Sequence, residues 1–135
     1  MKKLFLVLTF VAFTWSAFAC EISIWLDGKP ITPNANINLA LGSVHSLTVR
    51  FVPDHLNCSL KAEATIFMLG DEKWKTGKDY QLLSLGSPIV WKETAARVYE
   101  TKIDFKAVKS GLTFLEIIRE CSKGGYDEKI YFSIK

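Results

Sequence analysis

The sequence of 135 residues has no long run of like charge and no apolar run long enough to cross a membrane. Nucleic-acid binding needs clustered Lys and Arg for phosphate contacts, so we expect no nucleic-acid partner. The apolar run at 4–13 is shorter than the roughly 20 residues that a spanning helix requires. No repeat is found, and no window of about 11 residues keeps a helical period.

Catalytic and metal-binding motifs are also missing. The sequence has no Gly-x-Ser-x-Gly, no Cys-x-x-Cys and only 2 His. A serine nucleophile of the hydrolase type and a clustered zinc site normally show such patterns. We therefore expect a protein that is not an enzyme and that carries no cofactor.

The first 19 residues have the three parts of a secretory signal peptide. Lys2 and Lys3 give a positive start, the apolar run follows, and Ala17-Phe18-Ala19 supplies small residues for cleavage. We predict a cleaved signal peptide at 1–19, a single mature domain at 20–135, and a periplasmic or secreted location. Association with a membrane is expected only if Cys20 is lipidated, and Phe18 stands where lipoprotein signals usually have a small residue.

The mature region alternates apolar and polar residues with period two, which predicts half-buried strands. About seven or eight strands with turns between them indicate an all-β fold, an immunoglobulin-like two-sheet antiparallel sandwich, with a small barrel as the alternative. The segment 112–120 is apolar on both faces, as in a central strand. In 60–69 we expect Met68 on the core face. The predicted strands are 21–26, 44–52, 60–69, 81–85, 89–92, 97–105, 112–120 and 128–134.

The three cysteines are expected to gather at one end of this sandwich. An exported chain meets oxidising conditions, so disulfides are the first interpretation. Cys58 lies in the connection after the second strand, and Cys121 follows the penultimate strand. We predict a Cys58–Cys121 disulfide. Cys20 begins the first strand at the same end, so a pairing with Cys20 stays open.

A soft-metal site is the alternative use of these residues. His55 stands close to Cys58, and thiolates with an imidazole suit copper(I) or zinc. The alternative function is therefore a periplasmic metal-binding protein with ligands from Cys20, His55, Cys58 and Cys121. The other histidine, His45, is expected to be a hydrogen-bonded residue at a strand edge.

Aromatic residues in polar loops are the best candidates for a binding surface. Trp74 and Tyr80 flank a lysine-rich loop, and Tyr126 lies in a Gly-Gly hairpin loop. Such side chains are favoured at interfaces. The leading functional hypothesis is an exported, non-enzymatic binding or accessory module that contacts a protein partner or exported complex through loops at the cysteine-bearing end. The alternative for Trp74 is that it folds back onto the sheet edge.

The stretch 99–119, with Phe105-Lys106-Ala107-Val108-Lys109-Ser110-Gly111-Leu112-Thr113-Phe114 at its centre, resembles a bacterial immunoglobulin-like signature. Chagasin-type inhibitors of cysteine proteases share this pattern. The resemblance implies the sandwich fold and makes protease inhibition a further alternative function. The Asn-Pro-x-Thr-Gly and Arg-Pro-aromatic motifs of those inhibitors are absent, because Arg119 is followed by Glu120 and Cys121. No inhibitory residue is therefore assigned.

Overall fold

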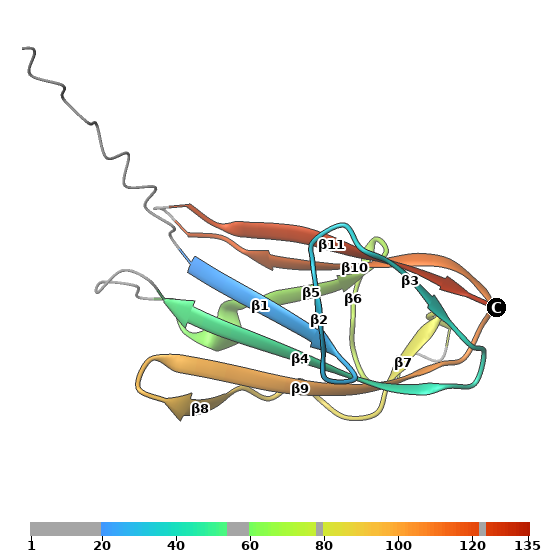
Figure 1. Ribbon diagram of the computed structural model, residues 1–135, viewed down its shortest axis with the longest axis horizontal. Helices are drawn as coiled ribbons and strands as arrows, with labels where there is room; N and C mark the ends of the chain where they lie inside the picture. Colours follow the sequence, from blue (N-terminus) through green and yellow to red (C-terminus); the bar gives the residue numbers. More distant parts are fainter. Residues whose placement is uncertain (1–19, 54–59, 78–79, 122–123) are drawn as a thin grey trace, which may run out of the picture.

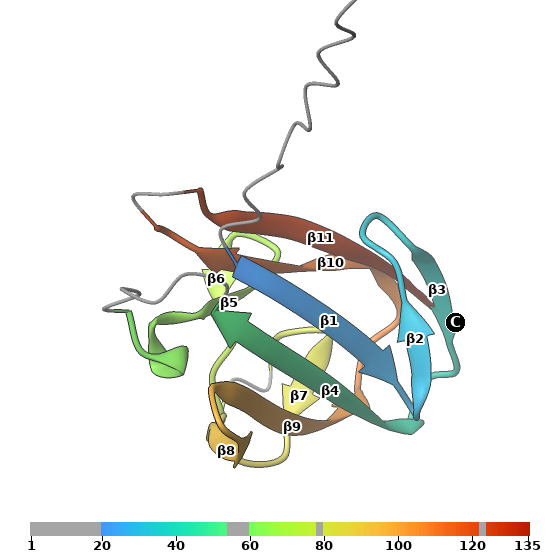
Figure 2. The ribbon, with the colours of Figure 1, turned by 60° about the vertical axis from the view of Figure 1, so that its left-hand side comes forward.

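The computed structural model describes residues 20–53, 60–77, 80–121 and 124–135, which form two β-sheets packed face to face (Figures 1 and 2). Sheet A has the strand order β2-β1-β4-β9-β7, and β8 also pairs with β9. Its strands are β1 (Cys20–Leu26), β2 (Lys29–Ile31), β4 (Val44–Pro53), β7 (Leu83–Leu85), β8 (Lys92–Ala95) and β9 (Val98–Ala107). Sheet B has the order β3-β11-β10-β5-β6. Its strands are β3 (Asn36–Leu39), β5 (Ile66–Leu69), β6 (Glu72–Lys73), β10 (Gly111–Arg119) and β11 (Tyr126–Ile134).

This topology is that of an immunoglobulin-like sandwich, as the sequence predicts. Strands β1, β4, β9 and β8 share one sheet, and β5, β10 and β11 share the other, which corresponds to the ABED and CFG sheets of that fold. Sheet B is mixed rather than purely antiparallel, because β3 pairs in parallel with β11. The short strand β2 contains Pro30 and lies at the edge of sheet A, where a missing N–H is tolerated.

The core lies between the sheets and is filled by alternate residues of the long strands. In β4 the inward residues are Leu47, Val49 and Phe51, as the alternation predicts. Phe105 of β9 meets Phe132 of β11 edge to face across the core, with ring centroids 6.2 Å apart. Strand β10 is central in sheet B, as its two apolar faces indicate. The described part of the chain contains no helix that could cross a bilayer.

The predicted strand 60–69 is wrong in its first half and in its phase. Ala62–Ala64 is a short 3₁₀ helix, and the strand β5 begins only at Ile66. Phe67 and Leu69 are buried, whereas Met68 is on the solvent side. A shift of one residue moves every side chain of a strand to the other face, and the 3₁₀ helix introduces such a shift. The predicted core position of Met68 is therefore corrected.

Candidate functional site

The ends of four strands form what we call the cysteine end of the sandwich. Cys20 begins β1 and pairs with Pro53 at the end of β4. Arg119 ends β10 and pairs with Tyr126 at the start of β11, and Cys121 follows Arg119 (Figure 1, left). His55 and Cys58 lie outside the described residues, so the Cys58–Cys121 disulfide and the four-residue metal site remain predictions. Within the described ranges, no three His, Cys, Asp or Glu residues gather as a metal site.

The buried charge of Arg119 organises the cysteine end. Only 2% of this residue is exposed. Its Nη1 donates to the carbonyl oxygens of Lys61 at 3.1 Å and Ala62 at 3.3 Å, and to the Thr65 hydroxyl at 2.8 Å. Its Nη2 donates to the carbonyl oxygen of Leu60 at 3.2 Å. The side chain therefore ties the segment around the 3₁₀ helix to the core.

Arg119 is not among the site residues predicted from sequence, although its place in β10 carries a signal. In β10 the inward residues are Leu115, Ile117 and Arg119, so the arginine occupies a core position by parity. A buried arginine normally needs acceptors for several donors, and carbonyl groups of a non-strand segment supply them here. The pattern thus indicated a core position for Arg119, but not which segment supplies its acceptors.

A hollow of about 310 Å³ lies beside the segment that Arg119 holds. The side chains of Phe51 and Tyr99, which stack with centroids 6.1 Å apart, form part of its wall. Exposed Lys61 and Glu63 lie at its rim, together with half-exposed Leu60. An apolar wall with a charged rim is suited to an apolar side chain of a protein partner.

Tyr126, a predicted binding residue, lies at the cysteine end but packs partly into the core. Burial, with a smaller effect of the Glu128 charge, raises the pKa of Tyr126 to about 12. The phenol, which is neutral at physiological pH in any case, thus keeps its proton and its hydrogen-bond donor to a higher pH than an ordinary tyrosine. This position is compatible with contact through the exposed part of the ring.

The other two predicted binding residues do not join Tyr126. Trp74 is 4% exposed, its Nε1 donates to the Leu83 carbonyl oxygen at 2.9 Å, and its ring meets Phe105 edge to face. Its proposed role as a surface contact is thus corrected, and it belongs to the core. Tyr80 is 51% exposed, but its carbonyl oxygen accepts from Lys109 in the turn between β9 and β10, at the end opposite the cysteines.

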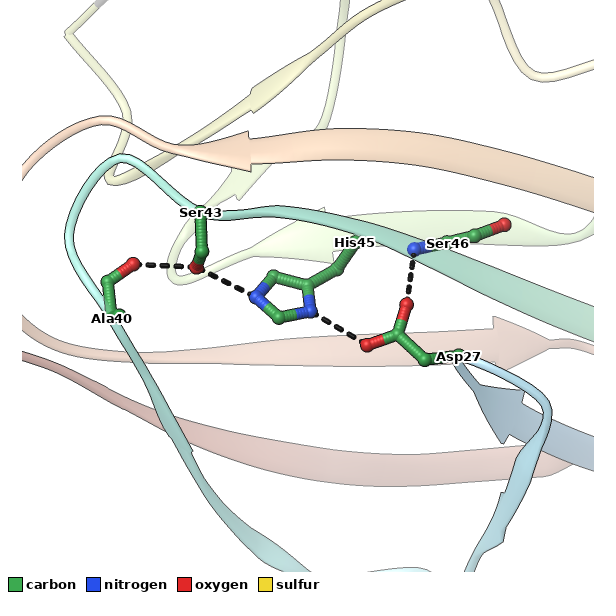
Figure 3. A network of polar contacts seen from close by, with 5 residues as sticks. All are labelled: Asp27, Ala40, Ser43, His45 and Ser46. Carbon is green, nitrogen blue, oxygen red and sulfur yellow. Dashed lines mark hydrogen bonds and ion pairs between the residues drawn. The ribbon is translucent and has the colours of Figure 1, made fainter.

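A second polar cluster lies at this opposite end and links two turns and the start of β4 (Figure 3). His45 Nδ1 lies 2.7 Å from Asp27 Oδ2, and His45 Nε2 lies 2.7 Å from Ser43 Oγ. The Ser46 amide donates to Asp27 Oδ1 at 2.9 Å. The hydrogen bond from His45, followed by that from Ser46, lowers the pKa of the Asp27 carboxyl below its usual range. His45 is thus a hydrogen-bonded residue near the start of β4, as predicted.

The order Asp27, His45, Ser43 resembles an acyl-transfer triad, but its surroundings do not suit that chemistry. The Ser43 hydroxyl donates to the Ala40 carbonyl oxygen at 2.5 Å. The amides of Leu41, Gly42 and Ser43 donate to the backbone oxygens of Lys135, Ala107 and Ala40, respectively. An oxyanion hole needs amides that point at the substrate, and these three are already engaged. The cluster fastens the turns before β2 and β4.

Comparison with known proteins assigns the chain to no family. No protein-family model matches the sequence, and no curated protein matches it. Among solved structures, a chimeric titin Z1Z2 functionalised with a decorin peptide has a TM-score of 0.41 at 12% identity, covering 85% of this chain and 98% of that one. Titin domain M7 has a TM-score of 0.40 at 14% identity, covering 84% and 96%. The twitchin kinase region from C. elegans has a TM-score of 0.40 at 11% identity, covering 84% of this chain and 16% of that one.

Proposed function

We propose that this chain is an exported, non-enzymatic binding module that holds a protein partner at its cysteine end. The observation that carries the proposal is the buried Arg119, which fixes the 60–65 segment beside the hollow lined by Phe51 and Tyr99. The sandwich supplies a rigid scaffold, and binding surfaces on such scaffolds commonly lie in the segments between strands.

Burying a guanidinium is costly, because its hydration must be replaced by hydrogen bonds within the protein. Here the four hydrogen bonds of Arg119 all go to one irregular segment. Fixing such a segment before binding reduces the conformational entropy that association would otherwise lose. The arrangement therefore favours a contact surface formed in advance by Leu60, Lys61 and Glu63.

Export is part of the proposal and is supported by the signal-like residues 1–19. In an oxidising compartment, a Cys58–Cys121 disulfide would close the same end that Arg119 organises. Purification of the exported protein, followed by mass spectrometry of its N-terminus and of its disulfides, tests this part directly.

The contact surface is tested by photo-crosslinking in cells that produce the full chain. A photoreactive amino acid replaces Lys61 or Glu63 at the cysteine end, and the matched controls replace Lys102 or Asp104, which are exposed on the outer face of sheet A. We expect one specific protein adduct from the first pair, identified by mass spectrometry, and none from the controls. Equal adducts at all four sites, or none at Lys61 and Glu63, would contradict the proposed surface.

A further inference from the structure

The solvent side of sheet B carries an unusual number of apolar side chains. Strands β5, β10 and β11 contribute what we call the apolar face: Ile66, Met68, Leu112, Phe114, Ile118 and Tyr131. The strand register places Phe114 opposite Tyr131 and Ile118 opposite Ile66, so these side chains are neighbours across the sheet. Leu112 is 82% exposed and Tyr131 is 39% exposed.

No second layer of the described chain packs over this face, on which Leu112 and Tyr131 are exposed and the other four apolar side chains are half-buried. Sheet A and the core lie on the other side of sheet B (Figures 1 and 2). The apolar character on both sides of β10 matches a strand that is buried on both sides, although here only one side is packed within the subunit. A contiguous apolar area on a soluble protein generally marks an interaction surface.

The charged groups on the apolar face are balanced in sign. Lys129 Nζ lies 3.3 Å from Glu116 Oε1 and 4.7 Å above the ring of Phe114, in the middle of the face. At its margins the register places Lys73 opposite Met68 and Asp127 opposite Ile118. The face thus carries two positive and two negative side chains, with one acid and one base already paired.

We propose that the apolar face is covered by the same face of a second copy of this chain, in a two-fold symmetric dimer. A two-fold axis repeats each contact, so the surface must be complementary to itself. The face meets this condition: its charges sum to zero, and a two-fold axis that runs parallel to the strands, between β10 and β11, places Glu116 of each copy opposite Lys129 of the other. Apolar sheet faces stack at about 10 Å in β-sandwiches, and the intervening side chains are of the kind that fill such layers.

The balance of charge on the apolar face favours a second copy of the chain over the main alternative occupant, an anionic lipid surface. An anionic lipid surface attracts faces with an excess of Lys and Arg. The apolar face has no such excess among Lys73, Glu116, Asp127 and Lys129. The proposal does not depend on the cysteine end, because none of the apolar-face residues lines the hollow beside Arg119.

Sedimentation velocity of the mature protein over a range of concentrations tests the dimer. We expect the wild type to dimerise and Leu112→Lys and Tyr131→Lys to sediment as monomers. The matched control is Val90→Lys, since Val90 is an apolar residue that is 61% exposed outside the apolar face. It should dimerise like the wild type. A wild-type monomer at several hundred micromolar, or a dimer that Leu112→Lys and Tyr131→Lys leave intact, would overturn the proposal.

Charge reversal tests the orientation of the two copies. Glu116→Lys places only bases at the centre of the face, and Lys129→Glu places only acids there. Each variant alone should dimerise at least tenfold more weakly, whereas an equimolar mixture, followed by fluorescence energy transfer between labelled copies, should restore the wild-type affinity. A mixture no tighter than the separate variants would overturn the face-to-face arrangement. Crosslinking from positions 61 and 63 in the monomeric variants is a separate readout of the partner surface. If these crosslinks are retained, the proposed function stands whether or not the dimer proposal does.

Discussion

The guanidinium carbon of Arg119 lies 3.7 Å from the centroid of the Phe51 ring. Arg119 belongs to β10 of sheet B and Phe51 to β4 of sheet A, so this contact joins the two sheets at the cysteine end. The charge is met by an aromatic face and by backbone carbonyl oxygens rather than by a carboxylate. The 60–65 segment, and with it the shape of the hollow that it lines, should therefore depend on the side chain of Arg119.

Replacing Arg119 by Met tests this dependence. The change keeps the apolar stem but removes the hydrogen bonds to Leu60, Lys61 and Thr65, so we expect a loss of about 2–4 kcal/mol in the free energy of unfolding. Urea denaturation measures it. The matched variant Arg50→Met removes an exposed ion pair with Glu100 and should cost less than about 1 kcal/mol. Similar losses in both variants would contradict the structural role of Arg119.

Gly125 tests how closely the chain approaches itself at the same end. A Cβ at this position would overlap the carbonyl oxygen of Arg119. Gly125→Ala should therefore separate the ends of β10 and β11, with a loss of about 1–3 kcal/mol and faster hydrogen exchange at Arg119 and Tyr126. Gly28→Ala is the control, because a Cβ there meets nothing within 4 Å and the cost is confined to its φ of +78°. Unchanged exchange at Arg119 in Gly125→Ala would refute the expectation.

The long strands could be predicted from sequence because their residues alternate without interruption. In β4, β9 and β11 the buried residues are those that the period-two pattern indicates. The 60–69 segment has an equally regular pattern, yet Ala62–Ala64 turns before β5 begins. The acceptors that Arg119 requires lie in that turn, and this long-range hydrogen bonding cannot be seen in a local window.

The candidate site was harder to predict than the fold for a related reason. Residue type and loop position indicated Trp74, Tyr80 and Tyr126, but the distance between them is decided by how the strands connect. The chain passes from one end of the sandwich to the other between Ile66 and Tyr80. Trp74 can lie in the core because the carbonyl oxygen of Leu83 accepts its indole N–H there. Leu83 belongs to β7, so this partner is not part of the segment that contains Trp74.

The buried position of Trp74 leads to a prediction about stability rather than binding. Trp74→Ala should lower the free energy of unfolding by about 3–5 kcal/mol, since it removes the contact with Phe105 and opens a cavity. Tyr80→Ala, at an exposed site, should change it by about 0.5 kcal/mol or less. Thermal and urea unfolding of both variants provide the measurement. If Trp74→Ala is as stable as Tyr80→Ala, the assignment of Trp74 to the core is wrong.

The contact between Asp27 and His45 predicts that the free energy of unfolding depends on pH in the acid range. Because the folded state lowers the pKa of Asp27, the unfolded chain takes up a proton first as the pH falls. The stabilisation is complete above the unfolded pKa near 3.8 and is lost as the pH falls through the lower folded value. It should amount to less than about 1 kcal/mol, because Asp27 is half exposed.

Urea unfolding between about pH 2 and 6 compares the wild type with Asp27→Asn. The variant should lack the decrease in the free energy of unfolding that protonation of Asp27 causes at low pH. Asp104→Asn is the control, since the carboxylate of Asp104 approaches Lys102 only to 4.0 Å on the outer face of sheet A. The Asp104→Asn variant should keep the decrease in the free energy of unfolding at low pH that Asp27 causes. His45→Gln removes the largest cause of the shift, so carboxyl-carbon NMR should show the pKa of Asp27 moving back towards its usual value. An unchanged Asp27 titration in His45→Gln would show that Ser46 alone holds the carboxylate.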